Sequence, residues 1–462
     1  MSDARQPQLE SLLRQSGPAT AAALGAALGV SQPTISRLLT NAGTHIVRIG
    51  KARASRYALS RDIGLAGNRW PLYRIGADGL PDTLGELRAL HGGGFHLQPA
   101  RPLPAFLHGA SSHQPFADGL FPDLPWFLDD QRPQGFLGRA FVRRVAASID
   151  APDDLVQWNT DHIVLALLRH GEDAPGDLLL GEQALQRALQ AMLSADAMAL
   201  SDRPQRYPSL AAAALAGEDI GSSAGGEQPK FTALLRDGEG FRAVIVKFSE
   251  RAGTPAAQRW ADLLRCEHIA ADVLNTHGVA AAASDLLEAD GRVFLQSTRF
   301  DRTPALGRRG LVSLAALDAA YYGHGRIDWW KFAPQLQRDG WLRADDARIL
   351  ALRGWFGALI GNSDMHLGNA SLVLTNARPL ALAPSYDMLP MALRPASTGE
   401  VVPRTLDIVP PLPDQRDIWV DAACMAQLFW QRIEATSTIS GEMRTIADAQ
   451  RRKITAALAR FR

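Results

Sequence analysis

The chain has 462 residues, of which 46% are hydrophobic and 21% charged, and these proportions exclude a disordered, fibrous or membrane-embedded class. At about 150 residues per domain, the length predicts two or three domains. The net charge of +1 predicts no strong overall attraction to nucleic acid or acidic membranes. The charge is uneven, however: residues 1–62 hold 8 basic and 3 acidic side chains, whereas the rest of the chain holds 41 and 45. One small end of the chain is therefore basic.

The two cysteines form no C-x-x-C pair, so the sequence indicates neither a disulfide framework nor a zinc site and favours a reducing compartment. The first residues are polar and lack the apolar core of a secretory signal. Ala-rich runs at 19–30 and 208–217 are shorter than the ~18 residues that a membrane helix needs. We therefore expect a cytoplasmic protein without membrane association.

The first sixty residues predict three short helices and a hairpin. The second helix runs from about Ala19 to Leu28, and after Gly29 a third begins with Ser31 as N-cap and Pro33 in its first turn. This spacing is typical of a helix-turn-helix unit with a basic wing. Outward side chains of the third helix and of the wing would contact DNA bases and phosphates; they are Gln32, Thr34, Ser36, Arg37, Arg48, Lys51, Arg53 and Arg56. The alternative is a small three-helix adaptor with a solvated basic hairpin.

The signals over 63–215 are weaker. Residues 92–138 are rich in Gly, Pro and aromatic residues and predict an irregular, partly buried connection, from which we derive no chemistry. A loop of small residues at 221–230 then feeds an extended run at 231–235, which pairs with a strand at 241–249 in a predicted hairpin. Such a loop can expose backbone N–H groups to phosphate oxygens, although a plain turn is the alternative.

The same loop fits the G-x-S-x-G pattern of a hydrolase over residues 221–225. A nucleophile elbow follows a buried strand and opens a helix. Here an Ala-rich, helix-like stretch comes first and a strand follows. The order is reversed, which argues against an esterase.

Lys247 lies inside an otherwise apolar strand, where an unpaired ammonium costs several kcal/mol. Glu267 falls on the buried stripe of a helix predicted at about 256–276. The two charges predict an ion pair that positions the lysine on nucleotide phosphates. Two unrelated edge residues are the alternative.

A polar loop at 361–369 precedes a second predicted hairpin. Asn369 and Asp387 each lie nine positions from Arg378 in its turn, so both reach the open end of the hairpin. Phosphoryl transfer needs a carboxylate near the attacking hydroxyl and oxygen ligands for Mg²⁺. Asp364 is the predicted base, and Asn369 with Asp387 are the predicted metal ligands. A capped helix followed by a polar loop is the alternative.

The segments SSAGGEQPK, VIVKFS, STRFDR, GNSDMHLGN and APSYDML together resemble the HipA-like serine/threonine kinases of bacterial toxin-antitoxin systems. The resemblance is strongest over 220–400. It implies an α+β, two-lobed protein-kinase-like fold with ATP and Mg²⁺ as cofactors. By the same resemblance, Lys247 contacts ATP phosphates, Asp364 is the catalytic base, and Asn369 and Asp387 bind Mg²⁺.

The resemblance also implies autophosphorylation in the Gly-rich loop, at Ser223. Phosphate there would add close to two negative charges, eject the loop and end activity. Backbone groups of the hinge between the lobes, at 296–300, would hold the adenine, and His366 would orient the loop around Asp364 or cap it. The residues expected to bind ATP are Ser222, Ser223, Ala224, Gly225, Gly226, Lys247, Gln296, Thr298, Phe300 and His366.

The expected domains are a winged helix-turn-helix over 1–62, a kinase N-lobe with its own N-terminal subdomain over 63–300, and a mainly helical C-lobe over 301–462. Typical members rely on a separate HipB-like DNA-binding antitoxin, whereas this chain would carry its own DNA-binding domain. That arrangement resembles the YjjJ-type subgroup.

The sequence thus predicts a toxin-like, ATP- and Mg²⁺-dependent protein serine/threonine kinase that binds DNA through residues 1–62. The expected partners are DNA, a protein substrate that by resemblance is an aminoacyl-tRNA synthetase, a HipB-like antitoxin and a second copy of the chain. The alternative is a transcriptional regulator whose silent kinase-like part senses nucleotide. The presence of the lysine, the base and both metal ligands argues against that alternative.

Overall fold

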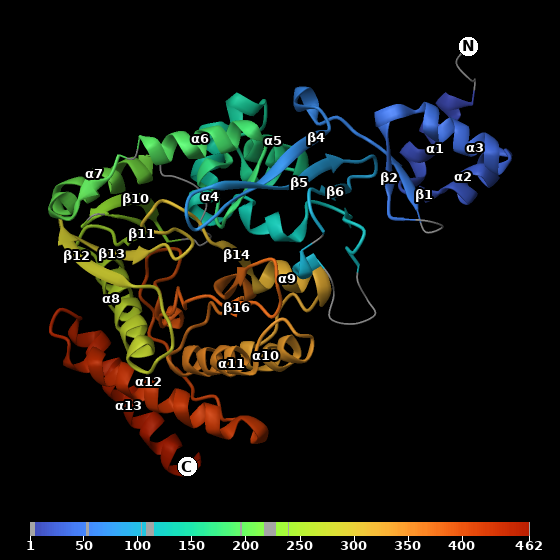
Figure 1. The fold of residues 1–462 in the computed structure, drawn as a ribbon. Coiled ribbons are helices and arrows are strands. Elements are labelled where there is room, and N and C mark those ends of the chain that lie inside the picture. Colours follow the sequence, from blue (N-terminus) through green and yellow to red (C-terminus); the bar gives the residue numbers. More distant parts are fainter. Residues whose placement is uncertain are drawn as a thin grey trace.

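The computed structural model describes residues 5–51, 55–102, 104–107, 115–194, 196–216, 228–238 and 240–461. Six residues singled out above lie outside these ranges: Arg53 of the wing and Ser222, Ser223, Ala224, Gly225 and Gly226 of the Gly-rich loop. Helices and strands are mixed along the chain (Figure 1).

The helices are α1 (Gln6–Ser16), α2 (Ala21–Leu28), α3 (Gln32–Asn41), α4 (Gly135–Val145), α5 (Thr160–His170), α6 (Glu182–Leu193), α7 (Arg203–Ala216), α8 (Pro255–Thr276), α9 (Leu314–Tyr321), α10 (Trp329–Arg338), α11 (Ala344–Leu359), α12 (Arg416–Ala435) and α13 (Gly441–Phe461). The strands are β1 (Ala19–Thr20), β2 (Ile46–Ile49), β3 (Arg56–Leu59), β4 (Arg69–Ile75), β5 (Pro81–Ala89), β6 (Phe95–Pro99), β7 (Leu120–Phe121), β8 (Leu178–Leu180), β9 (Met198–Ala199), β10 (Lys230–Asp237), β11 (Gly240–Phe248), β12 (Ser284–Ala289), β13 (Arg292–Thr298), β14 (Gly310–Ser313), β15 (Ser371–Leu374) and β16 (Ala381–Leu382).

The N-terminal unit contains the three predicted helices and a small sheet of order β1-β3-β2. The Thr20 side chain accepts a hydrogen bond from the Ala23 N–H at the start of α2, and Gly29 ends that helix with a left-handed φ of 61°. Helix α3 buries its apolar stripe and leaves Gln32, Ser36 and Arg37 exposed. In Figure 1, α3 lies on the outer side of this unit, away from the rest of the chain.

The hairpin of β2 and β3 is docked on the next part of the chain. Val47 and Ile49 pack in one apolar cluster with Leu90, and Ser60 forms an antiparallel bridge with Leu90. Arg56 forms an ion pair with Asp118. Arg56, which the sequence analysis assigned to DNA, is therefore committed to a carboxylate of its own chain.

The middle part contains a five-stranded antiparallel sheet of order β7-β6-β5-β4-β8. The described residues between 92 and 138 are more ordered than expected, because they include β6, β7 and the start of α4. Their rings are buried and meet edge to face, as Phe106 does with Trp126 and Phe127. This cluster is continuous with buried residues of the C-terminal helices. The predicted domain boundaries at 62 and 300 stay predictions.

The sheet that carries the candidate site has the order β12-β13-β11-β10-β9 and is antiparallel except for the β9–β10 pair. Helix α8 packs on it through Leu264, which shares a cluster with Leu295. The register places Lys247 directly opposite Lys230 on one side and Leu295 on the other. Directly opposed residues point to the same face of a sheet.

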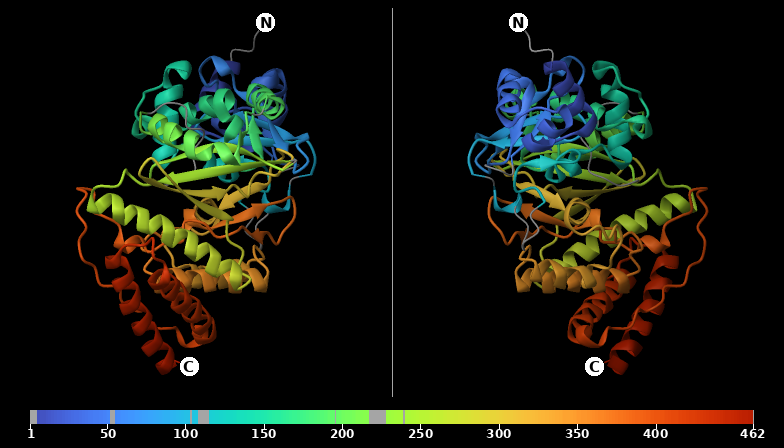
Figure 2. Two further views of the ribbon diagram at one scale, coloured as in Figure 1. Left: turned by 90° about the vertical axis from the view of Figure 1, so that its left-hand side faces the viewer. Right: turned by 90° about the vertical axis from the view of Figure 1, so that its right-hand side faces the viewer.

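Helices α10 to α13 and the sheet β14-β15-β16 complete the chain, with the C-terminus at the opposite end from the N-terminal unit (Figure 2). Helix α11 is buried along much of its length, and Trp355 stacks on Trp330 with ring centroids 4.0 Å apart. The Trp355 Nε1 donates to Gln415 Oε1 at 2.9 Å. No helix in the described ranges has both the length and the apolar character to cross a membrane.

We predict that Trp355→Ala lowers the free energy of unfolding by about 3–5 kcal/mol, because it leaves a cavity beside Trp330. Urea unfolding followed by circular dichroism measures the change. Arg348 is on the same helix as Trp355 and forms an exposed ion pair with Asp421 of α12, so Arg348→Ala should cost less than about 1 kcal/mol. Equal losses for both variants would contradict the packing role of Trp355.

Candidate active site

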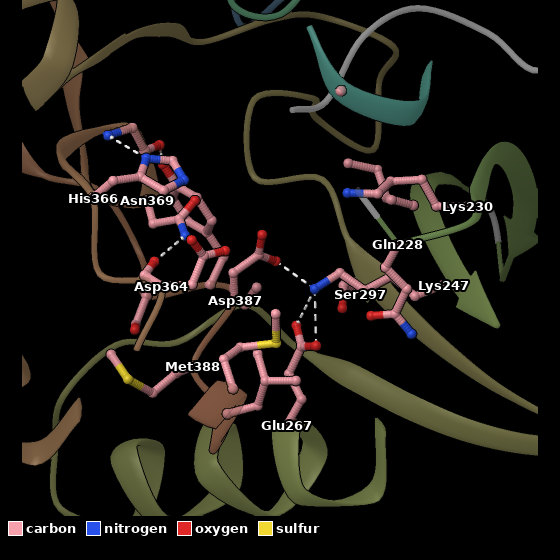
Figure 3. A pocket seen from close by; sticks show the side chains of 18 of the residues that line it. Gln228, Lys230, Lys247, Glu267, Ser297, Asp364, His366, Asn369, Asp387 and Met388 are labelled. Carbon is pink, nitrogen blue, oxygen red and sulfur yellow. Dashed lines mark hydrogen bonds and ion pairs between the residues drawn. The ribbon is translucent and has the colours of Figure 1, made fainter. Parts of the chain in front are cut away.

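A cavity of about 1200 Å³ is lined by side chains from β10, β11, α8 and β13 and from the later segments 364–371 and 385–404. Figure 3 shows part of this lining. Lys247, Glu267, Asp364, Asn369 and Asp387 all line it. The structure thus brings together the residues that the sequence analysis assigned to phosphoryl transfer.

Lys247 is held between two carboxylates. Its Nζ donates to both carboxylate oxygens of Glu267, at 2.7 and 2.8 Å, and to Asp387 Oδ1 at 2.5 Å. Glu267 comes from α8 and Asp387 from the segment after β16, so the lysine joins three distant parts of the chain (Figure 3). The predicted ion pair of Lys247 and Glu267 is present.

The charges in this cluster stabilise one another. Burial alone would lower the pKa of Lys247, but the carboxylates of Asp387 and Glu267 raise it above its ordinary value. Burial likewise favours a raised pKa for Asp387, yet Lys247 and Lys230 bring it below the usual range. The pKa of Glu267 is raised, because burial outweighs the attraction of Lys247. Lys247 is therefore charged at neutral pH.

The loop after α11 folds around its own polar groups. The Asp364 N–H donates to Asn362 Oδ1 at 3.0 Å, and Asn369 Nδ2 donates to the Asp364 carbonyl at 2.8 Å. The His366 Nδ1 accepts from the Gly368 N–H at 3.1 Å, so this ring caps a turn. The Asp364 side chain is exposed, and its carboxylate is open to a substrate. The Asn369 side chain uses its Nδ2 in the hydrogen bond to the Asp364 carbonyl, which leaves its Oδ1 available as a ligand.

Asn362 is a positioning residue that the sequence analysis missed. It is buried, and its Nδ2 donates to the Asp387 carbonyl at 3.2 Å while its Oδ1 holds the Asp364 N–H. Tyr386 adds a second link, since its hydroxyl donates to the Gly368 carbonyl at 2.9 Å. Asp387 itself has a positive φ of 53°, a conformation that Asp tolerates better than most residues. The two polar loops are therefore fixed relative to each other.

Asn369 and Asp387 suit a magnesium ion. Mg²⁺ in phosphoryl-transfer sites is held by one or two protein oxygens and keeps waters and phosphate oxygens as further ligands. Asn369 offers Oδ1, and Asp387 offers the oxygen that does not face Lys247. Within the described residues, no group of three or more His, Cys, Asp or Glu side chains could hold a metal.

The five expected ATP-binding residues within the described ranges divide into two groups. Thr298, Phe300 and His366 line the cavity together with Lys247. Gln296 does not: it is buried on the other face of β13, where its Oε1 accepts from the Tyr207 hydroxyl at 2.7 Å and from Arg203 at 3.0 Å.

Two backbone donors of the expected hinge already have partners, while the use of its other backbone groups stays a prediction. The Thr298 N–H donates to the Ala283 carbonyl, and the Arg299 N–H donates to the Ala243 carbonyl. These two donors are occupied by the sheet and are not available to an adenine base.

Two further lining residues were missed. Lys230 is buried, lies opposite Lys247 in the β10–β11 pair and lowers the pKa of Asp387. Asp130 comes from the middle region, where no chemistry was derived, and its carboxylate accepts from the Ser313 N–H at 2.5 Å. Burial raises the pKa of Asp130 to about 6, against the effect of the hydrogen bonds from Ser313. The period-2 pattern of β10 could have found Lys230, whereas Asp130 lies in a short 3₁₀ helix, Trp126–Gln131, that no sequence pattern indicated.

Comparison with known proteins agrees with the motifs. Residues 222–457 match the family described as "HipA-like C-terminal domain", and residues 66–189 match "YjjJ-like toxin, middle domain". Residues 222–457 thus form a C-terminal domain of the HipA-like class, and most of the cavity lining lies in this range. The protein named Toxin YjjJ, from Escherichia coli (strain K12), is 37% identical over 449 residues, which is 97% of each chain. The chain belongs to the YjjJ-like toxin family.

Two solved structures are also similar. A chain of the Shewanella oneidensis MR-1 toxin-antitoxin complex of HipA, HipB and operator DNA gives a TM-score of 0.49 at 16% identity, covering 84% of this chain and 97% of its own. The Helicobacter pylori proinflammatory kinase CtkA gives a TM-score of 0.36 at 15% identity, covering 52% and 93%.

We predict that Asp130→Asn changes the pH dependence of stability. The folded chain holds the Asp130 proton up to a pH of about 6, whereas the unfolded chain releases it near 3.8, so ionisation destabilises the folded wild type as the pH rises between these values. The variant lacks this loss and keeps an acceptor oxygen for Ser313. Urea unfolding should show that the free energy of unfolding of the variant, relative to that of the wild type, is higher at about pH 7 than at about pH 4.5.

Asp345→Asn, at an exposed position of α11, controls for the removal of one negative charge. A constant difference between Asp130→Asn and the wild type over this pH range would contradict the prediction.

Proposed function

We propose that this chain is an ATP- and Mg²⁺-dependent protein serine/threonine kinase of the HipA type that acts as a toxin. The observation that carries the proposal is the clamp of Glu267 and Asp387 on Lys247, in one cavity with Asp364 and Asn369. A lysine fixed by a helix carboxylate, a separate exposed carboxylate and two oxygen ligands are the groups that phosphoryl transfer to a hydroxyl requires.

In the proposed reaction, the oxygen of a serine or threonine hydroxyl forms a bond to the γ-phosphorus of ATP. The bond from that phosphorus to the bridging oxygen breaks, ADP leaves, and the hydroxyl proton passes to the Asp364 carboxylate. Mg²⁺, held by Asn369 and Asp387, would neutralise charge on the β- and γ-phosphates. Lys247 stays oriented by Glu267 while it contacts phosphate.

Three parts of this proposal rest on membership of the family. Autophosphorylation at Ser223 would place phosphate on the Gly-rich loop, with the loss of activity argued above. The protein substrate would be an aminoacyl-tRNA synthetase. A HipB-like antitoxin is a further proposed partner, alongside the DNA that the N-terminal unit would bind.

Asp364→Ala should lower phosphate transfer about 10²- to 10⁴-fold, the usual contribution of a general base. The assay incubates the full-length protein with γ-labelled ATP and Mg²⁺ and maps the label on the chain and on added proteins. ATP affinity, measured by calorimetry, should be unchanged, and Asp345→Ala at the exposed start of α11 should transfer at the wild-type rate.

Transfer by Asp364→Ala at the wild-type rate would show that another group is the base. A wild type that binds ATP but labels neither itself nor any added protein would overturn the kinase proposal in favour of a nucleotide sensor.

We also propose that the N-terminal unit is a winged helix-turn-helix that binds DNA with the outer face of α3 and with the wing. Gln32, Ser36 and Arg37 of α3 and Arg48 and Lys51 of the proposed wing are exposed. Deleting the whole unit would uncover the apolar contact of β2 with Leu90, so point substitutions are the sounder test.

Arg48→Ala and Lys51→Ala should each weaken DNA binding similarly on all sequences and reduce the slope of log K against log salt by about 1. Arg14→Ala, an exposed arginine on α1, is the matched control for lost charge. Fluorescence anisotropy with duplex DNA at several salt concentrations measures the slope. Slopes that all equal the wild-type value would contradict the wing contact.

A further inference from the structure

The segment after Asp387 forms one border of the cavity. We call residues 394–404 the rim segment, because Arg394, Ser397 and Arg404 from it line the cavity. It is anchored at both ends beside the Asp364 loop. The Ala392 N–H donates to the Gly361 carbonyl at 3.0 Å.

Leu406 anchors the other end. It is buried against Gly361, where an added Cβ would lie 2.8 Å from the Leu406 Cδ1. Between the anchors the segment turns back on itself, with the Ala396 N–H donating to the Glu400 carbonyl at 2.8 Å. Anchors on both sides fix the rim segment relative to Asp364.

The rim segment presents two arginines to the cavity. Arg394 donates to the Ser363 Oγ at 3.5 Å and to the Met391 carbonyl at 3.4 Å, so its guanidinium lies beside the residue that precedes Asp364. Arg404 lines the same cavity. Both side chains are exposed, and in the described part of the chain neither forms an ion pair with a carboxylate.

Several charges elsewhere in the cavity already have a partner of opposite sign. Lys247 is paired with Glu267 and Asp387, and Arg299 with Asp301, whereas Arg394 and Arg404 line the cavity without a carboxylate partner among the described residues. This end of the cavity therefore attracts an anion. A guanidinium binds carboxylate and phosphate oxygens equally well, so a phosphate of ATP and an acidic side chain of a protein are the two sources of that anion.

The position of Arg394 favours an acidic side chain of a protein substrate over a phosphate of ATP. ATP phosphates would lie at Lys247 and Asp387, while Arg394 contacts the neighbour of Asp364, where the accepting hydroxyl must be. We propose that Arg394 and Arg404 select a protein substrate with an acidic residue close to the serine or threonine that receives phosphate. The proposal rests on the proposed kinase function.

The test compares serine peptides of equal length, flanked by Glu or by Ala, as substrates of the full-length chain. The double variant Arg394→Gln and Arg404→Gln removes both positive charges. Its matched control is Arg326→Gln with Arg343→Gln, which removes the same charge at exposed positions that do not line the cavity.

For the wild type and the control, we expect kcat/KM for the Glu peptide to exceed that for the Ala peptide about tenfold, as two partly exposed ion pairs allow. The rim double variant should lose this preference and leave the KM for ATP unchanged. Equal use of both peptides by the wild type would overturn the proposal. A raised KM for ATP with the peptide preference intact would also overturn it, because the arginines would then serve the nucleotide.

A binding measurement separates this proposal from the kinase proposal. Fluorescein-labelled Glu and Ala peptides are titrated with protein, and the anisotropy is read at low salt. Tighter binding of the Glu peptide that the rim double variant abolishes supports the acidic site even when no phosphate is transferred. Transfer without any acidic preference overturns the acidic site and leaves the kinase proposal intact.

Discussion

The ion pairs of Lys247 hold the candidate site together. The lysine lies on a strand of one sheet, and its two carboxylate partners come from α8 and from the segment after β16. A buried ammonium is stable only when it is paired, and removing one partner of such a pair costs about 3–5 kcal/mol. The sheet, the helix and the later polar segment must therefore pack together for the cluster to exist.

The polar loops reach this cluster through the packing of α11. Trp355 of this helix stacks on Trp330 of α10, and the helix ends at the loop that contains Asn362 and Asp364. Asn362 then joins that loop to Asp387. The separation between the exposed Asp364 carboxylate and Lys247 is thus set by core packing and two amide hydrogen bonds. Rates of phosphoryl transfer depend on such positioning, because the chemistry needs little from the protein beyond placement and charge.

Much of this site could be predicted from the sequence, because isolated charges in apolar segments and clusters of amide side chains can be recognised without knowledge of the fold. The direction of the Gln296 side chain could not be read from the sequence, because side chains alternate between the two faces of a strand. Lys247 lies opposite Leu295, so side chains 295 and 297 share the face of Lys247, with Leu295 packed on α8 and Ser297 lining the cavity, and the Gln296 side chain points the other way. That alternation becomes informative only when the pairing register is known. Asp130 could not be predicted, because its approach to Ser313 depends on how the middle part of the chain packs on the C-terminal helices.

The docking of the β2–β3 hairpin on Leu90 has a geometric consequence. The bridge between Ser60 and Leu90 and the bidentate pair of Arg61 with Asp161, at 2.5 and 2.8 Å, leave no free linker between the N-terminal unit and the middle sheet. A DNA duplex bound by α3 would therefore fix the orientation of the cavity relative to the DNA axis. On a two-fold symmetric operator, the spacing of the half-sites, about 34 Å per helical turn, would then set the directions in which the cavities of two bound copies open.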